Sequence, residues 1–429
     1  MKKTIAAILA ALLLALTGCG GGQSEIPTSS GAAPAVGEQE AQPQVQEQET
    51  GSITNADALS SEQQEILLQF MDAYYQSLAS LQVQDVSGLF VEDAGHDEFS
   101  ASVDGTPWRA VTENQTQAAT HQAVWEMVVG MRRASGLDLR LLSYDYRLDC
   151  TQVQQLEDGC WQVEAMEYSD MRFAHSPDTT SSVTGIWHSF VMRQVDGAWY
   201  LTHHAAYDSA YFSFLRWEND STGTGTGGGT GEELASMAQA GIQAAQEQVD
   251  LRSGQTGDQP LPQAEHSYHR EEAVAYARQW AGERNPQWQV YDGMGGNCMN
   301  FVSQCLYASG IPMDESGSAQ WYWYSDSNRV PAWTGVSAFR EYAQNNTGYG
   351  LSAQVMGAPY YSGQTGDVIL MSTNGRYHHA VIISQVVSNE SGETVDYLIC
   401  SNTGNYRDFP AAAYVYPEQE LVRIAGWNG

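Results

Sequence analysis

The sequence predicts a protein of the α+β class with two globular segments separated by a polar, glycine-rich stretch. In the first segment, apolar residues at helical spacing precede runs in which apolar and polar residues alternate, as in half-buried strands. In the second, helical patterns precede strongly apolar strands. The 429 residues are 42% apolar and 10% aromatic, enough for packed cores, and their formal charge is −32. Such an acidic surface repels phosphate backbones, so we expect no nucleic-acid partner.

The N-terminus has the pattern of an export signal. Lys2 and Lys3 precede an apolar run from Ile5 to Leu16, which is too short to span a bilayer. The run ends in Leu-Thr-Gly-Cys19, which resembles a bacterial lipobox. This resemblance implies that residues 1–18 are a lipoprotein signal peptide and that Cys19 is lipidated, whereas the alternative is an ordinary signal peptide with an incidental cysteine. We therefore expect an exported protein, lipid-anchored to the outer face of the bacterial cytoplasmic membrane.

Two segments have the composition of linkers. Residues 19–55 are rich in Gly, Gln, Glu, Pro and Ser, and no basic residue lies between Lys3 and Arg109, which predicts a disordered tether. Residues 218–265 open with glycines and threonines, but no lysine follows them, so a linker is favoured over a phosphate loop. Within this linker, an Ala- and Gln-rich pattern between residues 232 and 249 allows a helix.

Residues 56–217 are expected to form helices followed by a curved antiparallel sheet. Helices are predicted over residues 62–81 and 121–133. Strands are predicted over residues 141–150, 160–172, 186–194 and 199–207. This pattern resembles the cone-shaped nuclear-transport-factor-like fold, without a sequence motif behind the likeness. The segment carries no predicted role.

The histidines and cysteines of residues 56–217 are interpreted as structural. Neighbours such as His203 and His204 point to opposite faces of a strand, and no metal-binding spacing accompanies them. We therefore expect no metal site. Cys150 and Cys160 could form a disulfide in an exported protein, provided that the loop between them is looser than a two-residue turn.

The chemistry is concentrated in residues 266–429. A helical pattern that begins near Tyr268 ends near Asn285 and Pro286. Two glycines and Asn297, a candidate N-cap, then come immediately before a helix that starts with Cys298. Amide N–H groups and the helix dipole at such a position can lower the pKa of a thiol and receive an oxyanion. Cys298 is therefore the candidate nucleophile, and Asn297 is a candidate for the oxyanion site.

A histidine and an asparagine follow the cysteine in the order found in papain-like and NlpC-like cysteine hydrolases. His378 and His379 lie on an apolar strand, and Asn402 follows the next strand. If the intervening turn is centred between Glu390 and Ser391, then Val387 faces Thr394 and His379 faces Asn402. This register selects His379 as the proton carrier and Asn402 as the residue that orients it, and His378 is the alternative if a bulge reverses the faces.

Residues 267–429 resemble the bacterial "putative amidase domain" family. The shared motifs are a Tyr-x-Arg helix, an Asn-Pro, an Asn-Cys-x-Asn-Phe-Val-Ser-Gln run around Cys298, a Gly-Asp-Val strand, and a histidine followed by apolar residues and Ser384. The family often has a His-Thr pair on the last strand, where this chain has Asn402-Thr403. The resemblance implies a papain-like α+β domain that hydrolyses amide or peptide bonds without a cofactor.

Several functions and roles stay open at this stage. The main hypothesis is an amidase or peptidase acting on peptidoglycan, the substrate within reach of a membrane tether. The alternative is a binding lipoprotein whose domain holds a glycan or protein partner without turnover. Trp321 and Trp323 could line the substrate cleft or belong to the core. Cys305 and Cys400 are expected to be buried thiols, with a disulfide between them as the alternative.

Lipidation gives a first test. Replacing Cys19 by Ala removes the atom that would carry the lipid, so the variant should stay unprocessed or be released into the medium. Membrane fractionation and the mass of the mature N-terminus measure this. An unchanged, processed and membrane-bound variant would contradict the lipobox interpretation.

Overall fold

A computed structural model describes residues 49–91, 100–103, 106–109, 117–157, 159–210, 231–255, 260–292 and 296–429. The predicted signal peptide, Cys19, most of the predicted tether and the glycine run at 223–230 lie outside these residues. Within the described part of the chain, no helix is long and apolar enough to cross a membrane.

The N-terminal segment contains the predicted helices and strands, together with three short strands and a 3-10 helix that the sequence pattern did not predict. Helix α1 (Ser61–Ser80) starts at a capping box in which Ser60 and Gln63 satisfy each other's backbone N–H groups. The other elements are β1 (Glu49–Thr54), η1 (Ser87–Leu89), β2 (Ser100–Val103), β3 (Thr106–Arg109), α2 (Gln117–Ala134), β4 (Leu141–Gln155), β5 (Trp161–Phe173), β6 (Ser181–Val195) and β7 (Ala198–Ala206). Asp196 and Gly197 both have positive φ and form the tight turn between β6 and β7.

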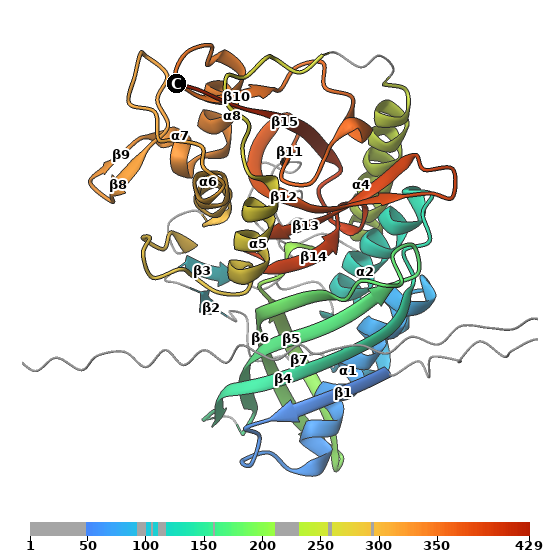
Figure 1. Cartoon of the computed structure of the whole chain (residues 1–429). Coiled ribbons are helices and arrows are strands. Elements are labelled where there is room, and N and C mark those ends of the chain that lie inside the picture. The colour runs from blue at the N-terminus through green and yellow to red at the C-terminus, as the bar shows by residue number, and fades with distance from the viewer. Residues whose placement is uncertain are drawn as a thin grey trace, which may run out of the picture. The chain divides into compact units, whose positions relative to one another are not determined.

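In the C-terminal part of the chain, helices precede the strands of the large sheet and also come between them along the sequence (Figure 1). The helices are α4 (Gly231–Ser253), α5 (Arg270–Trp280), α6 (Cys298–Ala308), α7 (Pro331–Thr334), α8 (Val336–Asn345), η3 (Tyr360–Ser362) and η4 (Ala411–Ala413). The strands are β8 (Trp323–Ser325), β9 (Asn328–Arg329), β10 (Gly350–Gln354), β11 (Val368–Thr373), β12 (Arg376–Ser388), β13 (Thr394–Ser401), β14 (Tyr406–Pro410) and β15 (Glu418–Asn428).

A mostly antiparallel sheet of 11 strands confirms the α+β class. Its order is β1-β4-β5-β6-β14-β13-β12-β11-β15-β10, with β7 also paired to β6. The join between its N-terminal and C-terminal strands is the pairing of β14 with β6, where Tyr406 faces Val183 and Arg407 faces Ser182. Sequence patterns predicted two segments but not that their strands hydrogen-bond to each other.

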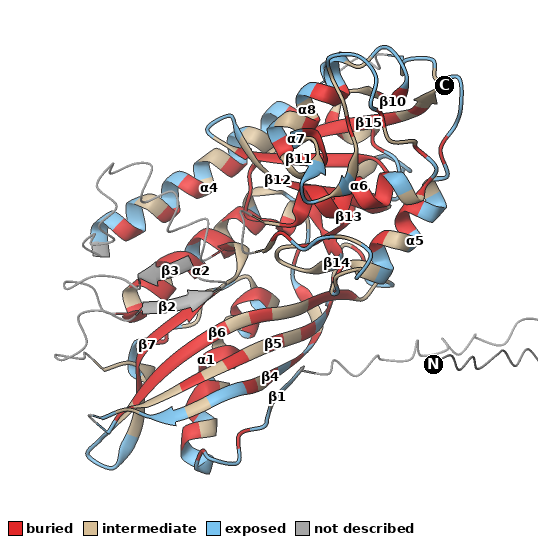
Figure 2. Cartoon of the chain, turned by 90° about the vertical axis from the view of Figure 1, so that its left-hand side faces the viewer, coloured by how far each residue is buried: buried red, intermediate tan, exposed pale blue. Residues whose placement is uncertain are grey.

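The two faces of β11, β12 and β13 belong to different hydrophobic cores. Val381 and Ile383 of β12 pack in the core that also contains residues of α1, α2 and β4–β7. Ala380 and Ile382, which point the other way, pack in the core formed with α5, α6, α7 and α8. Because side chains alternate along a strand, both faces of β12 are apolar, and these strands are almost wholly buried (Figure 2).

Two predicted linker boundaries differ from the structure. Residues 49–54, expected in the tether, form β1 and pair in parallel with β4. The helix allowed within the expected linker is α4, which is longer than its pattern suggested and buries Leu234, Ala238 and Ala245 against the first core. The alanine-rich face is buried because small side chains let α4 and α2 approach closely, as at Gly130, where an added Cβ would overlap Ile242.

The predicted hairpin register is wrong. Val387 faces Asp396, not Thr394, and Ile382 faces Cys400. The turn is longer than two residues because the Asn389 side-chain oxygen accepts the backbone N–H groups of Ser391 and Glu393. Irregularities next to Ile383 and Val387 then shift the pairing along the strand.

The start of α5 is fixed to the sheet by a buried ion pair. Arg270 donates to the Asp367 carboxylate at 2.7 Å and to the backbone oxygens of Thr365 and Ile424. The Asp367 side chain is 1% exposed, and burial raises the pKa of its carboxyl group despite the guanidinium beside it. This contact joins α5 to β11 and β15.

Replacing Arg270 by Gln should lower the free energy of unfolding by about 3 kcal/mol, because it leaves a buried carboxylate without its counterion. Without the arginine the folded-state pKa of Asp367 rises further above its unfolded value, so the folded protein takes up the proton first. The deficit should therefore shrink as the pH falls from 7 toward ~4. Urea unfolding at several pH values measures this.

The control is Arg140→Gln, whose ion pair with Asp138 is about half exposed and is expected to contribute little. Equal effects of the two substitutions, or a deficit that does not depend on pH, would contradict the role given to Arg270.

Candidate active site

Cys298 is the first residue of α6, as predicted, but Asn297 does not cap the helix with its side chain. Its side-chain oxygen accepts the backbone N–H of Tyr291 and the amide of Asn300, and its Nδ2 donates to Asn402 Oδ1 at 2.9 Å. Asn297 thus connects the segment before the helix, the helix itself and the loop after β13. The position is set by these bonds, in which the side-chain NH₂ group uses one of its two N–H donors.

The Cys298 thiol is buried, with the residue 5% exposed, and lies against the backbone of β12. Its sulfur is 3.9 Å from the carbonyl oxygen of His378. Backbone N–H groups of Ala380, Met299 and Cys298 itself favour the thiolate and so act to lower the thiol pKa. Burial outweighs them and raises the thiol pKa to about 11. The expected lowering of this pKa is therefore wrong for the resting structure, because desolvation is larger than the effect of the helix terminus.

His379 lies on the opposite face of β12 from Cys298. No irregularity interrupts the pairing of residues 379–382 with β11, so His379 shares a face with Val381, whereas Ala380 shares the face of Cys298. The His379 Nε2 atom is 2.9 Å from the Tyr414 hydroxyl. Burial, with a smaller effect of His378, lowers the His379 pKa to about 3, which keeps the imidazole neutral.

His378 is the extra residue of a β-bulge. Met371 pairs with His379 and Ser372 with Tyr377, which leaves His378 between them. Its ring nitrogen Nε2 is 2.8 Å from the Thr373 hydroxyl, and its ring packs edge-on against Tyr416. The residue is half-buried, and its own carbonyl contacts the Cys298 sulfur. Of the two histidines, His378 is thus the one whose backbone touches Cys298.

Asn402 lies on the Cys298 side of the sheet but orients no imidazole. Its Nδ2 donates to the backbone oxygens of Trp280 and Ala281 at 2.8 Å, and its Oδ1 accepts from Asn297. Asn402 therefore holds the end of α5 and the start of α6 together. The structure brings Cys298, Asn297 and Asn402 to one place, and it does not bring His379 to them.

The two candidate tryptophans have different environments. Trp321 is fully buried, and its indole donates to Ser303 Oγ at 3.1 Å, so it belongs to the core and not to a cleft wall. Trp323 is half-buried, and its indole donates to the Tyr291 hydroxyl at 2.8 Å. Because the Tyr291 N–H is bonded to Asn297, Trp323 lies two contacts from the start of α6.

Two supporting residues could not be chosen from the sequence. Thr403 accepts the backbone N–H of Asn297 at 2.8 Å and donates to Asp292. Asp292 also forms a two-pronged ion pair with Arg284. The only sequence signal was the place of Thr403 beside Asn402, where the resembling family often has a His-Thr pair.

The described cysteines form no disulfide bonds with one another. Cys150, Cys160, Cys298, Cys305 and Cys400 are buried and unbridged, so the disulfides left open by the sequence are not formed. Among the described residues, no group of three or more His, Cys, Asp and Glu side chains is arranged to hold a metal ion. His204 instead bonds to His188, and His203 to Thr202.

The fold and the site define an α+β domain with a buried cysteine at a helix N-terminus against an antiparallel sheet. Residues 267–422 match the family model described as "Putative amidase domain". Over 119 residues the chain is 32% identical to the "Uncharacterized protein YhbB" of Bacillus subtilis (strain 168), a stretch that covers 27% of this chain and 37% of that protein. The chain thus matches little more than a third of this relative's length. No solved structure matches the chain.

Timed labelling with iodoacetamide tests the state of the cysteine. Cys298 should react before Cys305 and Cys400, which are fully buried, and its rate should rise about tenfold per pH unit up to near pH 11. Peptide mass spectrometry gives the rate at each cysteine, and a Cys298→Ser variant identifies its peptide. A rate that levels off near pH 7 would show a preformed thiolate and would contradict the burial argument.

Proposed function

We propose that residues 267–422 hydrolyse an amide bond with Cys298 as the nucleophile. The observation that carries this proposal is the position of Cys298 at the N-terminus of α6, where backbone N–H groups favour its thiolate, inside the region that matches an amidase family. N–H groups in this position can also receive the oxyanion that forms when sulfur attacks a carbonyl.

The reaction would follow the usual course of cysteine hydrolases. The sulfur attacks the carbonyl carbon while an imidazole takes the thiol proton, and the C–N bond then breaks as that proton passes to the leaving nitrogen. Water hydrolyses the thioester, which releases the carboxylate and restores the thiol. Because the resting thiol pKa is about 11, the proton must leave during the attack and not before it.

The bulge geometry favours His378 over His379 as the proton carrier. His379 would have to cross the sheet to reach the sulfur, and it is held by Tyr414 on the far face. His378 is the histidine whose backbone already contacts Cys298. Its ring bonds to Thr373 and packs against Tyr416, so it would have to leave both contacts and turn toward the sulfur. Bulges commonly re-aim side chains next to active sites. Asn402 then acts as a positioning residue for α6, in place of the imidazole-orienting role first assigned to it.

The proposed substrate is peptidoglycan or another cell-wall peptide. This part of the proposal rests on the sequence: the lipobox-like Cys19 would place the domain at the outer face of the membrane, where such amide bonds are within reach. The acidic surface gives little electrostatic attraction to anionic wall polymers, so recognition would have to come from the cleft. No cofactor enters this mechanism.

A binding protein without turnover is the second candidate. The observation that favours it is the resting site itself, in which the thiol is protonated and buried and the neutral His379 faces away. In that case the papain-like domain would hold a glycan or a peptide. The two candidates differ in one measurable property, the release of new chain ends.

Digestion of purified peptidoglycan, followed by mass spectrometry of the new ends, tests the proposal. The wild type should release fragments, and Cys298→Ala should release none while keeping its unfolding midpoint within a few degrees. His378→Asn should lower kcat by about a hundredfold or more, as expected for a lost general base. His379→Asn, the matched variant one residue away, should keep most of the activity and lose mainly stability.

Each outcome has a distinct meaning. Activity that survives Cys298→Ala would exclude this cysteine as the nucleophile. A loss confined to His379→Asn would restore the assignment made from the sequence. Binding of peptidoglycan without cleavage would support the second candidate.

A further inference from the structure

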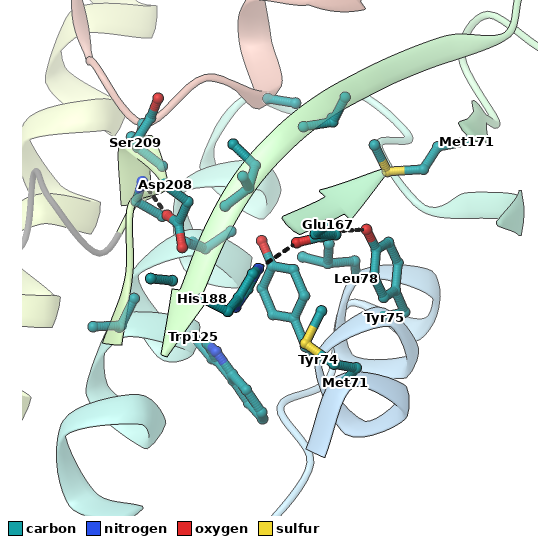
Figure 3. A pocket seen from close by; sticks show the side chains of 18 of the residues that line it. Met71, Tyr74, Tyr75, Leu78, Trp125, Glu167, Met171, His188, Asp208 and Ser209 are labelled. Carbon is teal, nitrogen blue, oxygen red and sulfur yellow. Dashed lines mark hydrogen bonds and ion pairs between the residues drawn. The ribbon is translucent and has the colours of Figure 1, made fainter. Parts of the chain in front are cut away.

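The first core contains a cavity between α1, α2, strands β5–β7 and the segment 406–415. Counted as space that the centre of a water molecule can occupy, its volume is about 70 Å³, several times the roughly 10–15 Å³ that one water needs. Most of its wall is apolar or aromatic, with Trp125, Tyr74, Met71, Leu78 and Met171 among the side chains that line it (Figure 3). Apart from the segment 406–415, which lies within the region matched to the amidase family, the cavity is formed by the part of the chain for which neither the sequence nor the comparisons give a role.

The Glu167 carboxylate in the wall already has hydrogen-bond partners within the protein. Glu167 bonds to the Tyr75 hydroxyl and, at 2.8 Å, to His188 Nε2, as the dashed lines of Figure 3 show. His188 Nδ1 is 2.9 Å from His204 Nε2, and the His204 ring continues the chain to His121. Asp208, also in the wall, accepts the backbone N–H of Ala210. The side chains of this network have hydrogen-bond partners within the protein, so the network does not by itself require a ligand.

Arg132 is the exception in this wall. It is 3% exposed, lies in the last turn of α2 and lines the cavity. Neither Nε nor Nη1 makes a hydrogen bond to any described residue, although both atoms are buried. Its guanidinium carbon lies 5.3 Å from the centre of the Phe173 ring, and burial lowers its pKa. A buried guanidinium without an acceptor is costly, so the site is incomplete as it stands.

We propose that this cavity binds a small organic molecule with one carboxylate, which pairs with Arg132, and an apolar or aromatic body. A carboxylate matches the forked donors of a guanidinium, which can hold both oxygens at once. Glu167 and Asp208 in the same wall would repel a doubly charged anion such as phosphate more strongly than a single carboxylate, so they disfavour it. The remaining wall favours an apolar body, since most of its side chains have no polar group to offer.

Binding to the full chain can be tested with matched probes. Phenylacetate and hexanoate keep the proposed carboxylate, whereas phenylacetamide and hexanamide keep the same body without the charge. Titrations monitored by ligand-observed NMR should give dissociation constants for the acids that are at least about tenfold lower than those for the amides. In Arg132→Met the two classes should bind with equal, weaker affinity, and Arg132→Lys should give an intermediate preference because it keeps the charge but not the fork.

Stability of the unliganded variants separates a binding role from a structural one. Arg132→Met removes an unpaired buried charge, so its unfolding midpoint should equal or exceed that of the wild type. Arg140→Met, at an exposed arginine, should bind the probes as the wild type does. Equal binding of acids and amides by the wild type, no binding of either acid, unchanged acid binding by Arg132→Met, or a collapse of that variant's stability would each overturn the proposal.

Discussion

The loop between β13 and β14 is the constraint on which both halves of the structure depend. On one side, Asn405 exchanges hydrogen bonds with the backbone of Thr184, next to the pairing that makes β6 and β14 neighbours in one sheet. On the other side, Asn402 and Thr403 hold the start of α6 through Asn297. A short polar loop therefore sets where Cys298 lies and how the N-terminal strands meet the C-terminal ones. Small side-chain amides suit this task, because each can donate and accept at once.

Desolvation is the largest influence on the pKa of Cys298, His379 and Arg132. At Cys298 it outweighs three N–H groups and the helix terminus, and at His379 it keeps the ring neutral. At Arg132 it acts on a guanidinium that has no acceptor from the described residues at two of its nitrogens. The same physics has opposite meanings in these places. For the thiol it favours the protonated form, whereas for the guanidinium it makes an unmet hydrogen bond costly.

The sheet also links the cavity beside Arg132 spatially to the candidate active site at Cys298. Tyr414 and Phe409, which line the cavity beside Arg132, belong to the segment that follows the site loop. Tyr414 contacts His379 as well, on the face of β12 away from Cys298. A ligand in the cavity would therefore touch residues within the region matched to the amidase family. The cavity is accordingly better regarded as shared between the two predicted segments than as a property of the first one alone.

Local patterns in the sequence predicted most of the elements and selected Cys298 as the candidate nucleophile. Helical spacing located α1, α2 and α5, alternation located β4–β7, and the run around Cys298 located the start of α6, because these signals depend only on neighbours along the chain. The register of β12 against β13, the face of His379 and the role of Asn402 were decided by tertiary structure. The bulge at His378 and the turn organised by Asn389 each add a residue that hydrophobic periodicity does not predict. One extra residue is enough to exchange the two faces of a strand. The pKa of Cys298 and the unpaired Arg132 were likewise beyond the sequence, since burial depends on elements that meet only when the chain is folded.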